Sequence, residues 1–108
     1  MKKTISAIIT ATDIAAINDF IRETQAIPDY DEEVILLKAV IASIKDYPIV
    51  NQFVIYTWFT IGDKSVTKTA DHLNVSPQCI SLYIKDFKEK TQAQFRNEYA
   101  DYQQWLQG

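Results

Sequence analysis

The stretch from Ser65 to Lys85 reads SVTKTADHLNVSPQCISLYIK. Ser76 followed by Pro77 indicates a helix start, because a serine side chain caps free amides and proline suits the first helical position. Asn74 tolerates the left-handed backbone of a tight turn better than most residues other than glycine. The stretch therefore predicts two short helices joined by a tight turn.

The apolar residues of this stretch support the same arrangement. Ala70 is small enough to stand where two steeply crossed helices touch, and Leu73 and Val75 can anchor the two sides of the turn. The second helix gains one buried side from residues spaced by four and three, which are Ile80, Ile84 and Phe87. The pattern predicts a helix-turn-helix over Val66–Lys88, within the limits 65–90.

The motif resembles the helix-turn-helix of bacterial transcription regulators. The residues that match are Ala70, Leu73, Asn74-Val75-Ser76 and Ile80-Ser81. They are similar to the motif of LuxR-type regulators, of the C-terminal region of sigma factors and of TrfB-type plasmid repressors. The sequence departs from these families at Thr69, where they have a larger apolar residue, and at Asn74, where glycine is commoner. The likeness covers about a fifth of the chain and implies DNA binding. A plain helical hairpin is the alternative.

In a DNA-binding helix-turn-helix the second helix enters the major groove with its N-terminal half facing the base edges. Gln78 could then bond adenine, Ser81 either base type, and Leu82 a thymine methyl. Lys85 and Lys88 lie further along the helix and suit phosphates, as do Thr67 and Lys68 at the start of the first helix. The predicted DNA-binding residues are Thr67, Lys68, Ser76, Gln78, Ser81, Leu82, Lys85 and Lys88.

Residues 12–62 are expected to form acidic N-terminal helices. Thr12 could cap the first, whose buried face would hold Ile14, Ile17, Phe20 and Ile21. Asp31 could cap the second, which has an apolar stripe and ends near Tyr47. Pro48 could stand in the first turn of a third, largely apolar helix, expected at the centre of the core, although its residues also suit a strand.

Residues 91–107 are expected to form a C-terminal aromatic helix. Its stripe consists of Phe95, Tyr99, Tyr102, Trp105 and Leu106. Two interpretations stay open: the stripe packs on its own domain, or it is the seam of a homodimer that reads two half-sites.

Composition limits the other possibilities. The 108 residues are 47% hydrophobic and contain two glycines, which favours one helical domain. The single cysteine, Cys79, and the single histidine, His72, are too few for a zinc site. No catalytic constellation or glycine-rich phosphate loop is present, so we expect a non-enzyme without cofactor or metal. No apolar run suits a membrane span, so a cytoplasmic protein is expected.

Charge is uneven along the chain. Residues 1–63 carry five basic and nine acidic side chains, whereas residues 64–90 carry five lysines and three acidic residues. The sequence therefore predicts an all-α single domain of about five helices that binds double-stranded DNA as a small bacterial, plasmid or phage transcription regulator. The alternative is an interaction module whose acidic helices contact RNA polymerase or another regulator.

Overall fold

Helices make up most of residues 4–95, the part of the chain that the computed structural model describes. These residues form six α-helices and one 3₁₀ helix, and no strand occurs among them. The elements are α1 (Ile5–Ile8), α2 (Ala11–Gln25), α3 (Glu32–Ala42), η1 (Ser43–Asp46), α4 (Ile49–Phe59), α5 (Val66–Leu73) and α6 (Pro77–Gln94). The predicted all-α fold is confirmed, with α1 as an additional short helix that the sequence did not indicate.

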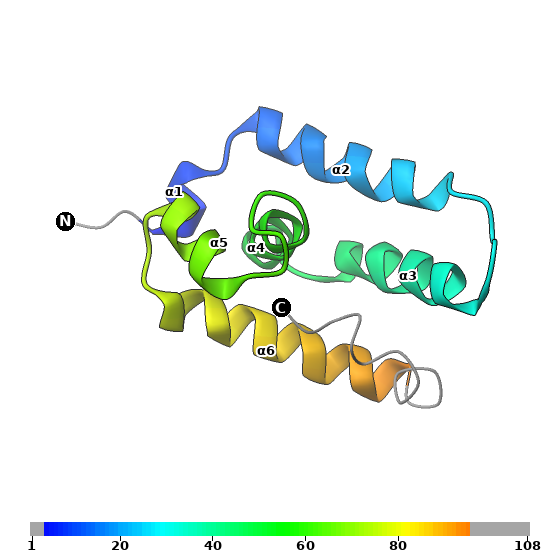
Figure 1. Cartoon of the computed structure of the whole chain (residues 1–108). Helices are drawn as coiled ribbons and strands as arrows, with labels where there is room; N and C mark the ends of the chain where they lie inside the picture. The colour runs from blue at the N-terminus through cyan, green and yellow to red at the C-terminus, as the bar shows by residue number, and fades with distance from the viewer. Residues whose placement is uncertain (1–3, 96–108) are drawn as a thin grey trace.

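Helix α4 occupies the centre of the molecule. It packs against α2 and η1 on one side and against α5 and α6 on the other (Figure 1). Its buried residues are Phe53, Val54, Ile55, Thr57 and Trp58. The predicted central position of this segment is confirmed, and the segment is a helix rather than a strand. Because α4 touches both halves, the pair α5–α6 is held on the same core as α2 and α3.

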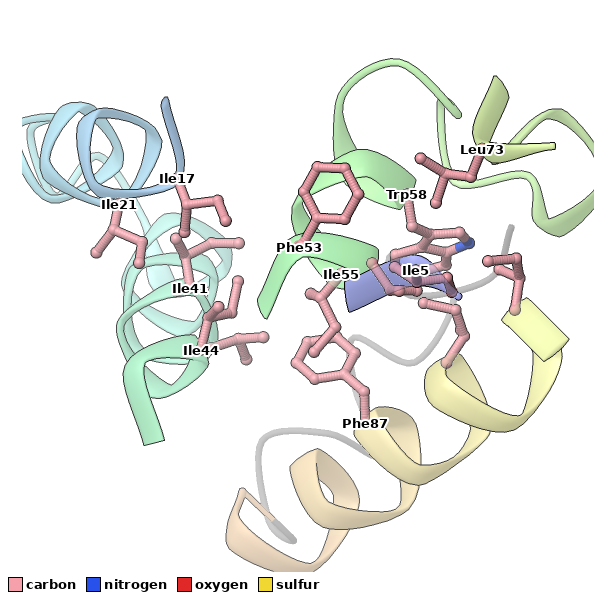
Figure 2. Packing of buried hydrophobic residues seen from close by; sticks show 14 of the residues in the cluster. Ile5, Ile17, Ile21, Ile41, Ile44, Phe53, Ile55, Trp58, Leu73 and Phe87 are labelled. Carbon is pink, nitrogen blue, oxygen red and sulfur yellow. The ribbon is translucent and has the colours of Figure 1, made fainter. Parts of the chain in front are cut away.

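The core has two parts that meet at α4. Figure 2 shows Ile17, Ile21, Ile41 and Ile44 from α2, α3 and η1 gathered on one side, and Trp58, Leu73 and Phe87 gathered on the other. Phe53 and Ile55 of α4 lie between the two groups (Figure 2). One continuous apolar cluster therefore joins α2 and α3 to α5 and α6.

Two helix starts differ from the sequence-based expectation and one agrees with it. The cap of α2 is Thr10 rather than Thr12, because Asp13 stands three residues on and completes a reciprocal capping box. Pro48 is the N-cap of α4 and precedes its first turn. Asp31 caps α3 as predicted, with its carboxylate accepting a hydrogen bond from Val34 N at 3.0 Å. Ile14, expected on the buried face of α2, is 41% exposed.

The predicted boundary at residue 91 is not a helix boundary. Helix α6 continues through Gln94, Thr91 is buried within it, and Phe95 is its C-cap. Phe95 is half-buried against the core. The remaining members of the predicted stripe, Tyr99, Tyr102, Trp105 and Leu106, lie outside the described residues.

The turn between α4 and α5 depends on a close approach of Gly62 to Thr69. A Cβ placed on Gly62 would lie 2.0 Å from Thr69 Oγ1 and 3.2 Å from the Thr57 carbonyl oxygen. Thr69 is fully buried, and its hydroxyl donates to the Ser65 carbonyl at 2.7 Å, so it cannot move aside freely. Position 62 therefore requires glycine, because any side chain would collide with Thr69 and with the Thr57 carbonyl.

We expect Gly62→Ala to lower the free energy of unfolding by about 1–3 kcal/mol through overpacking. Thr69→Ala removes the hydroxyl that the new methyl group would meet, so the double variant should lose less stability than the two single losses added together. Urea unfolding of the four proteins measures this coupling. Strictly additive losses would show that the contact does not set the turn.

Tyr47, the C-cap of η1, connects η1 to α6. Its ring packs edge-on against Phe87 at 5.9 Å between centroids, and Lys90 Nζ lies 5.1 Å from its centroid. Burial raises the pKa of Tyr47 from its ordinary value of 10.0 to about 12, and the nearby carboxylates of Asp86 and Asp46 add to the effect. The folded chain therefore keeps the Tyr47 proton at a pH where the unfolded chain loses it.

Because only the unfolded chain ionises this phenol between pH 10 and about 12, Tyr47 should make stability fall as pH rises through that window. We expect Tyr47→Phe to lose less stability than the parent between these pH values in urea unfolding. Tyr30→Phe, which alters a phenol that is 75% exposed, is the matched control and should keep the parent's loss. Equal profiles for Tyr47→Phe and the parent would contradict the assignment.

Candidate nucleic-acid interface

The turn between α5 and α6 is formed by Asn74 in the left-handed conformation, with φ 55° and ψ 46°. The N–H of Val75 donates to the Ala70 carbonyl at 3.1 Å, and the N–H of Asn74 donates to the Asp71 carbonyl at 3.3 Å. This pair of bonds is a Schellman motif, which satisfies the last free carbonyls of a helix. The predicted role of Asn74 is confirmed, and it directs the chain sharply from α5 into α6.

The start of α6 follows the sequence signals closely. Ser76 is the N-cap, with its hydroxyl oxygen accepting a hydrogen bond from Cys79 N at 3.3 Å, and Pro77 occupies the first helical position. Ser65 caps α5 in the same way through Lys68 N at 3.2 Å. Ser76 therefore has a structural function in addition to its predicted place in the interface.

Helices α5 and α6 pack against each other. Ala70 of α5 is fully buried, and Leu73 is nearly so. Helix α6 buries Ile80, Ile84 and Phe87, as predicted, together with Thr91. A small residue at Ala70 allows α5 to approach α6 closely, so the geometry of the pair depends on it.

The opposite side of α6 is open to solvent. The structure brings Gln78, Ser81, Leu82 and Lys85 together on this side, and all four are exposed. Leu82 is 70% exposed, which is unusual for a large apolar side chain. Thr67 and Lys68 are exposed in the first turn of α5. These six side chains, with half-buried Ser76 and Lys88, constitute the candidate interface.

The lysines of the candidate interface are not neutralised by carboxylates of the described residues. Lys68, Lys85 and Lys88 form no ion pair with any residue of the described range 4–95. By contrast, Arg22 pairs with Asp19, Lys38 with Asp29, and Lys90 with Asp86 across the adjacent side of α6. Lys45 of η1 also forms no ion pair with the described residues, and the other three unpaired lysines lie on α5 and on the side of α6 that carries Ser81 and Lys85.

Lys88 differs from the other two lysines because it is half-buried. Its Nζ lies 5.4 Å from the centroid of the Trp58 ring, within the range of a cation–π contact. Burial lowers the pKa of the Lys88 ammonium. Trp58 is itself fully buried, and its indole Nε1 has no hydrogen-bond acceptor among the described residues. Sequence reasoning placed Lys88 in the interface but gave no sign of Trp58 beneath it.

A surface hollow of about 280 Å³ lies beside Lys88. Its lining comes from Val66 at the start of α5 and from six residues of α6, which are Ser81, Ile84, Lys85, Lys88, Glu89 and Gln92. Glu89 supplies one carboxylate against two ammonium groups. Val66, Glu89 and Gln92 were not among the predicted site residues. Val66 reaches the hollow only because α5 packs against α6, whereas Glu89 and Gln92 follow Lys85 and Lys88 by four residues on α6, and helical spacing could have placed them there.

Comparisons with protein-family models, with curated proteins and with solved structures find no match to this chain. Within residues 4–95 no helix has the length and apolar character needed to cross a bilayer. No group of three or more His, Cys, Asp or Glu side chains in that range is arranged to hold a metal ion. The case for a function therefore depends on the geometry and charge of α5 and α6.

Because Asn74 has a left-handed backbone, substitutions at this position should change the free energy of unfolding according to how well the new residue adopts that conformation. Asn74→Ala should lower the free energy of unfolding by about 1–2 kcal/mol, because a Cβ without a local hydrogen-bonding group disfavours this conformation. Asn74→Gly should leave stability unchanged or raise it. Asn18→Ala, at an exposed position inside α2, is the control and should not destabilise. Chemical unfolding tests all three, and an unchanged Asn74→Ala variant would rule out the strained turn.

Proposed function

We propose that this chain is a sequence-specific, double-stranded DNA-binding protein that acts in the cytoplasm as a small transcription regulator of a bacterial, plasmid or phage operon. The observation that supports it most is the exposed side of α6, where Gln78, Ser81, Leu82 and Lys85 follow a tight turn. An α-helix fits the major groove, and residues in its first turns reach the base edges. Gln78 is suited to adenine and Leu82 to a thymine methyl.

The unpaired lysines support the same function. Lys68 on α5 and Lys85 and Lys88 on α6 flank the side chains proposed to read bases. Neutralising phosphates with free lysines releases counterions and supplies sequence-independent affinity. A lysine already paired with a carboxylate would contribute less, because the pair must be broken first. The net charge of −3 is therefore compatible with a local cationic surface.

A homodimer would complete the proposed binding mode. One helix-turn-helix contacts few base pairs, and two protomers on one duplex raise the effective concentration of the second unit. The aromatic stripe that begins at Phe95 is the proposed seam, with Tyr99, Tyr102, Trp105 and Leu106 as its further members.

A second candidate function rests on the far end of the molecule. The connection between α2 and α3 exposes Tyr30 and Ile27, and Ile35 is 51% exposed on α3. The exposed acidic residue Glu33 lies in the same part of the sequence. An apolar surface with nearby acids suits a basic protein partner such as a region of RNA polymerase. Binding of such a partner through this surface would be unaffected by changes in α6.

The test uses a duplex enriched by the parent protein from a random pool. Gln78→Ala should weaken binding to its preferred sequence by about 1–3 kcal/mol and relax preference at one base pair. Lys85→Ala should weaken all duplexes alike and reduce the slope of log affinity against log salt by about one unit.

Lys45→Ala is the matched control, since it removes an exposed lysine from η1 and changes the net charge equally. It should bind almost as the parent does. If no duplex is enriched, or if Gln78→Ala and Lys85→Ala bind as tightly as Lys45→Ala, the proposed interface is wrong.

A further inference from the structure

The hollow between α5 and α6 contains a cation whose surroundings favour an anionic ligand. Lys88 is half-buried, and no carboxylate of the described residues pairs with it. Its ammonium lies over the Trp58 ring, which partly replaces water but supplies no negative counter-charge. A partly desolvated cation without a counter-ion attracts an anion more strongly than a fully hydrated one does.

The rest of the hollow suits the oxygens of a phosphate group. Lys85 brings a second ammonium, Ser81 a hydroxyl donor and Gln92 an amide donor. Val66 and Ile84 provide apolar walls, which reduce screening by water. Glu89 opposes the anion, so the hollow carries an excess of one positive charge among these groups. This balance fits a singly charged phosphodiester.

We propose that this hollow binds phosphate oxygens, and that in the DNA complex it takes one backbone phosphodiester, with Lys88 held in place by Trp58. This inference rests on the proposed function, because the phosphodiester is supplied by a duplex on the exposed side of α6. Ser81 belongs both to the hollow and to the exposed side. One phosphate bound here would therefore set how far α6 enters the groove.

Trp58 provides a direct reporter of this event. The chain has two tryptophans, and Trp105→Phe leaves Trp58 as the single one. Because Trp105 belongs to the proposed dimer seam, the duplex affinity of this background is measured beside that of the parent, and every further variant is compared with the background. An anion paired with Lys88 changes the charge above the indole ring, so Trp58 emission should change saturably. The midpoint of the change should match duplex binding measured by anisotropy on the same sample.

Three variants in that background separate the hollow from general charge effects. Lys88→Met keeps the apolar stem but removes the charge; it should abolish the Trp58 response and weaken duplex binding about tenfold, with a shallower salt dependence. Lys88→Arg keeps the charge and should retain both. Lys85→Met should weaken duplex binding but retain the Trp58 response. Circular dichroism of each variant verifies folding.

The outcomes distinguish this inference from the proposed function. A duplex that binds tightly without a Trp58 response, and equally tightly to Lys88→Met, overturns the inference and leaves the DNA function intact. In another outcome, inorganic phosphate changes Trp58 emission saturably, Lys88→Met abolishes this change, and no duplex binds. That outcome supports the hollow as a phosphate site and overturns the DNA function. No Trp58 response to either probe, together with no duplex binding by anisotropy, overturns both proposals.

Discussion

Helix α4 packs against α6 through aromatic rings, and the other helices are held in place around this contact. Trp58 and Phe59 of α4 meet Phe87 of α6 edge-on, with centroid separations of 6.5 and 6.0 Å. Edge-to-face rings at such distances are favourable beyond the area they bury. Phe59 also packs against Phe20 of α2 at 6.2 Å. This chain of rings connects the N-terminal helices to the helix that carries the candidate interface.

The same contact gives α6 its two different sides. Once Phe87, Ile84 and Ile80 face α4 and α5, helical geometry leaves Gln78, Ser81 and Lys85 on the solvent side. It also places Lys88 at the margin, where its stem is covered and its ammonium meets the Trp58 ring. The functional proposals thus follow from the core: what α6 offers a ligand is determined by what α4 buries.

The parts that could be predicted from sequence are those with local causes. Ser76, Pro77 and Asn74 each act on the backbone within a few residues, and the structure has the cap, first helical residue and left-handed turn that they predict. Thr10 was missed although its partner Asp13 is local, since Thr12 offers a competing cap. The approach of Gly62 to Thr69 and the position of Lys88 over Trp58 could not be predicted, because they arise only when separate helices pack together.

The proposed DNA-binding surface of α5 and α6 can be tested by mapping amide chemical shifts of the labelled chain during titration with an enriched duplex. We expect saturable shifts whose affinity falls as salt is raised, at Thr67, Lys68, Gln78, Ser81 and Lys85. The amides between Ile27 and Ile35, at the opposite end of the molecule, should remain unchanged (Figure 1). Shifts concentrated in that α2–α3 region, or no saturable change anywhere, would contradict it.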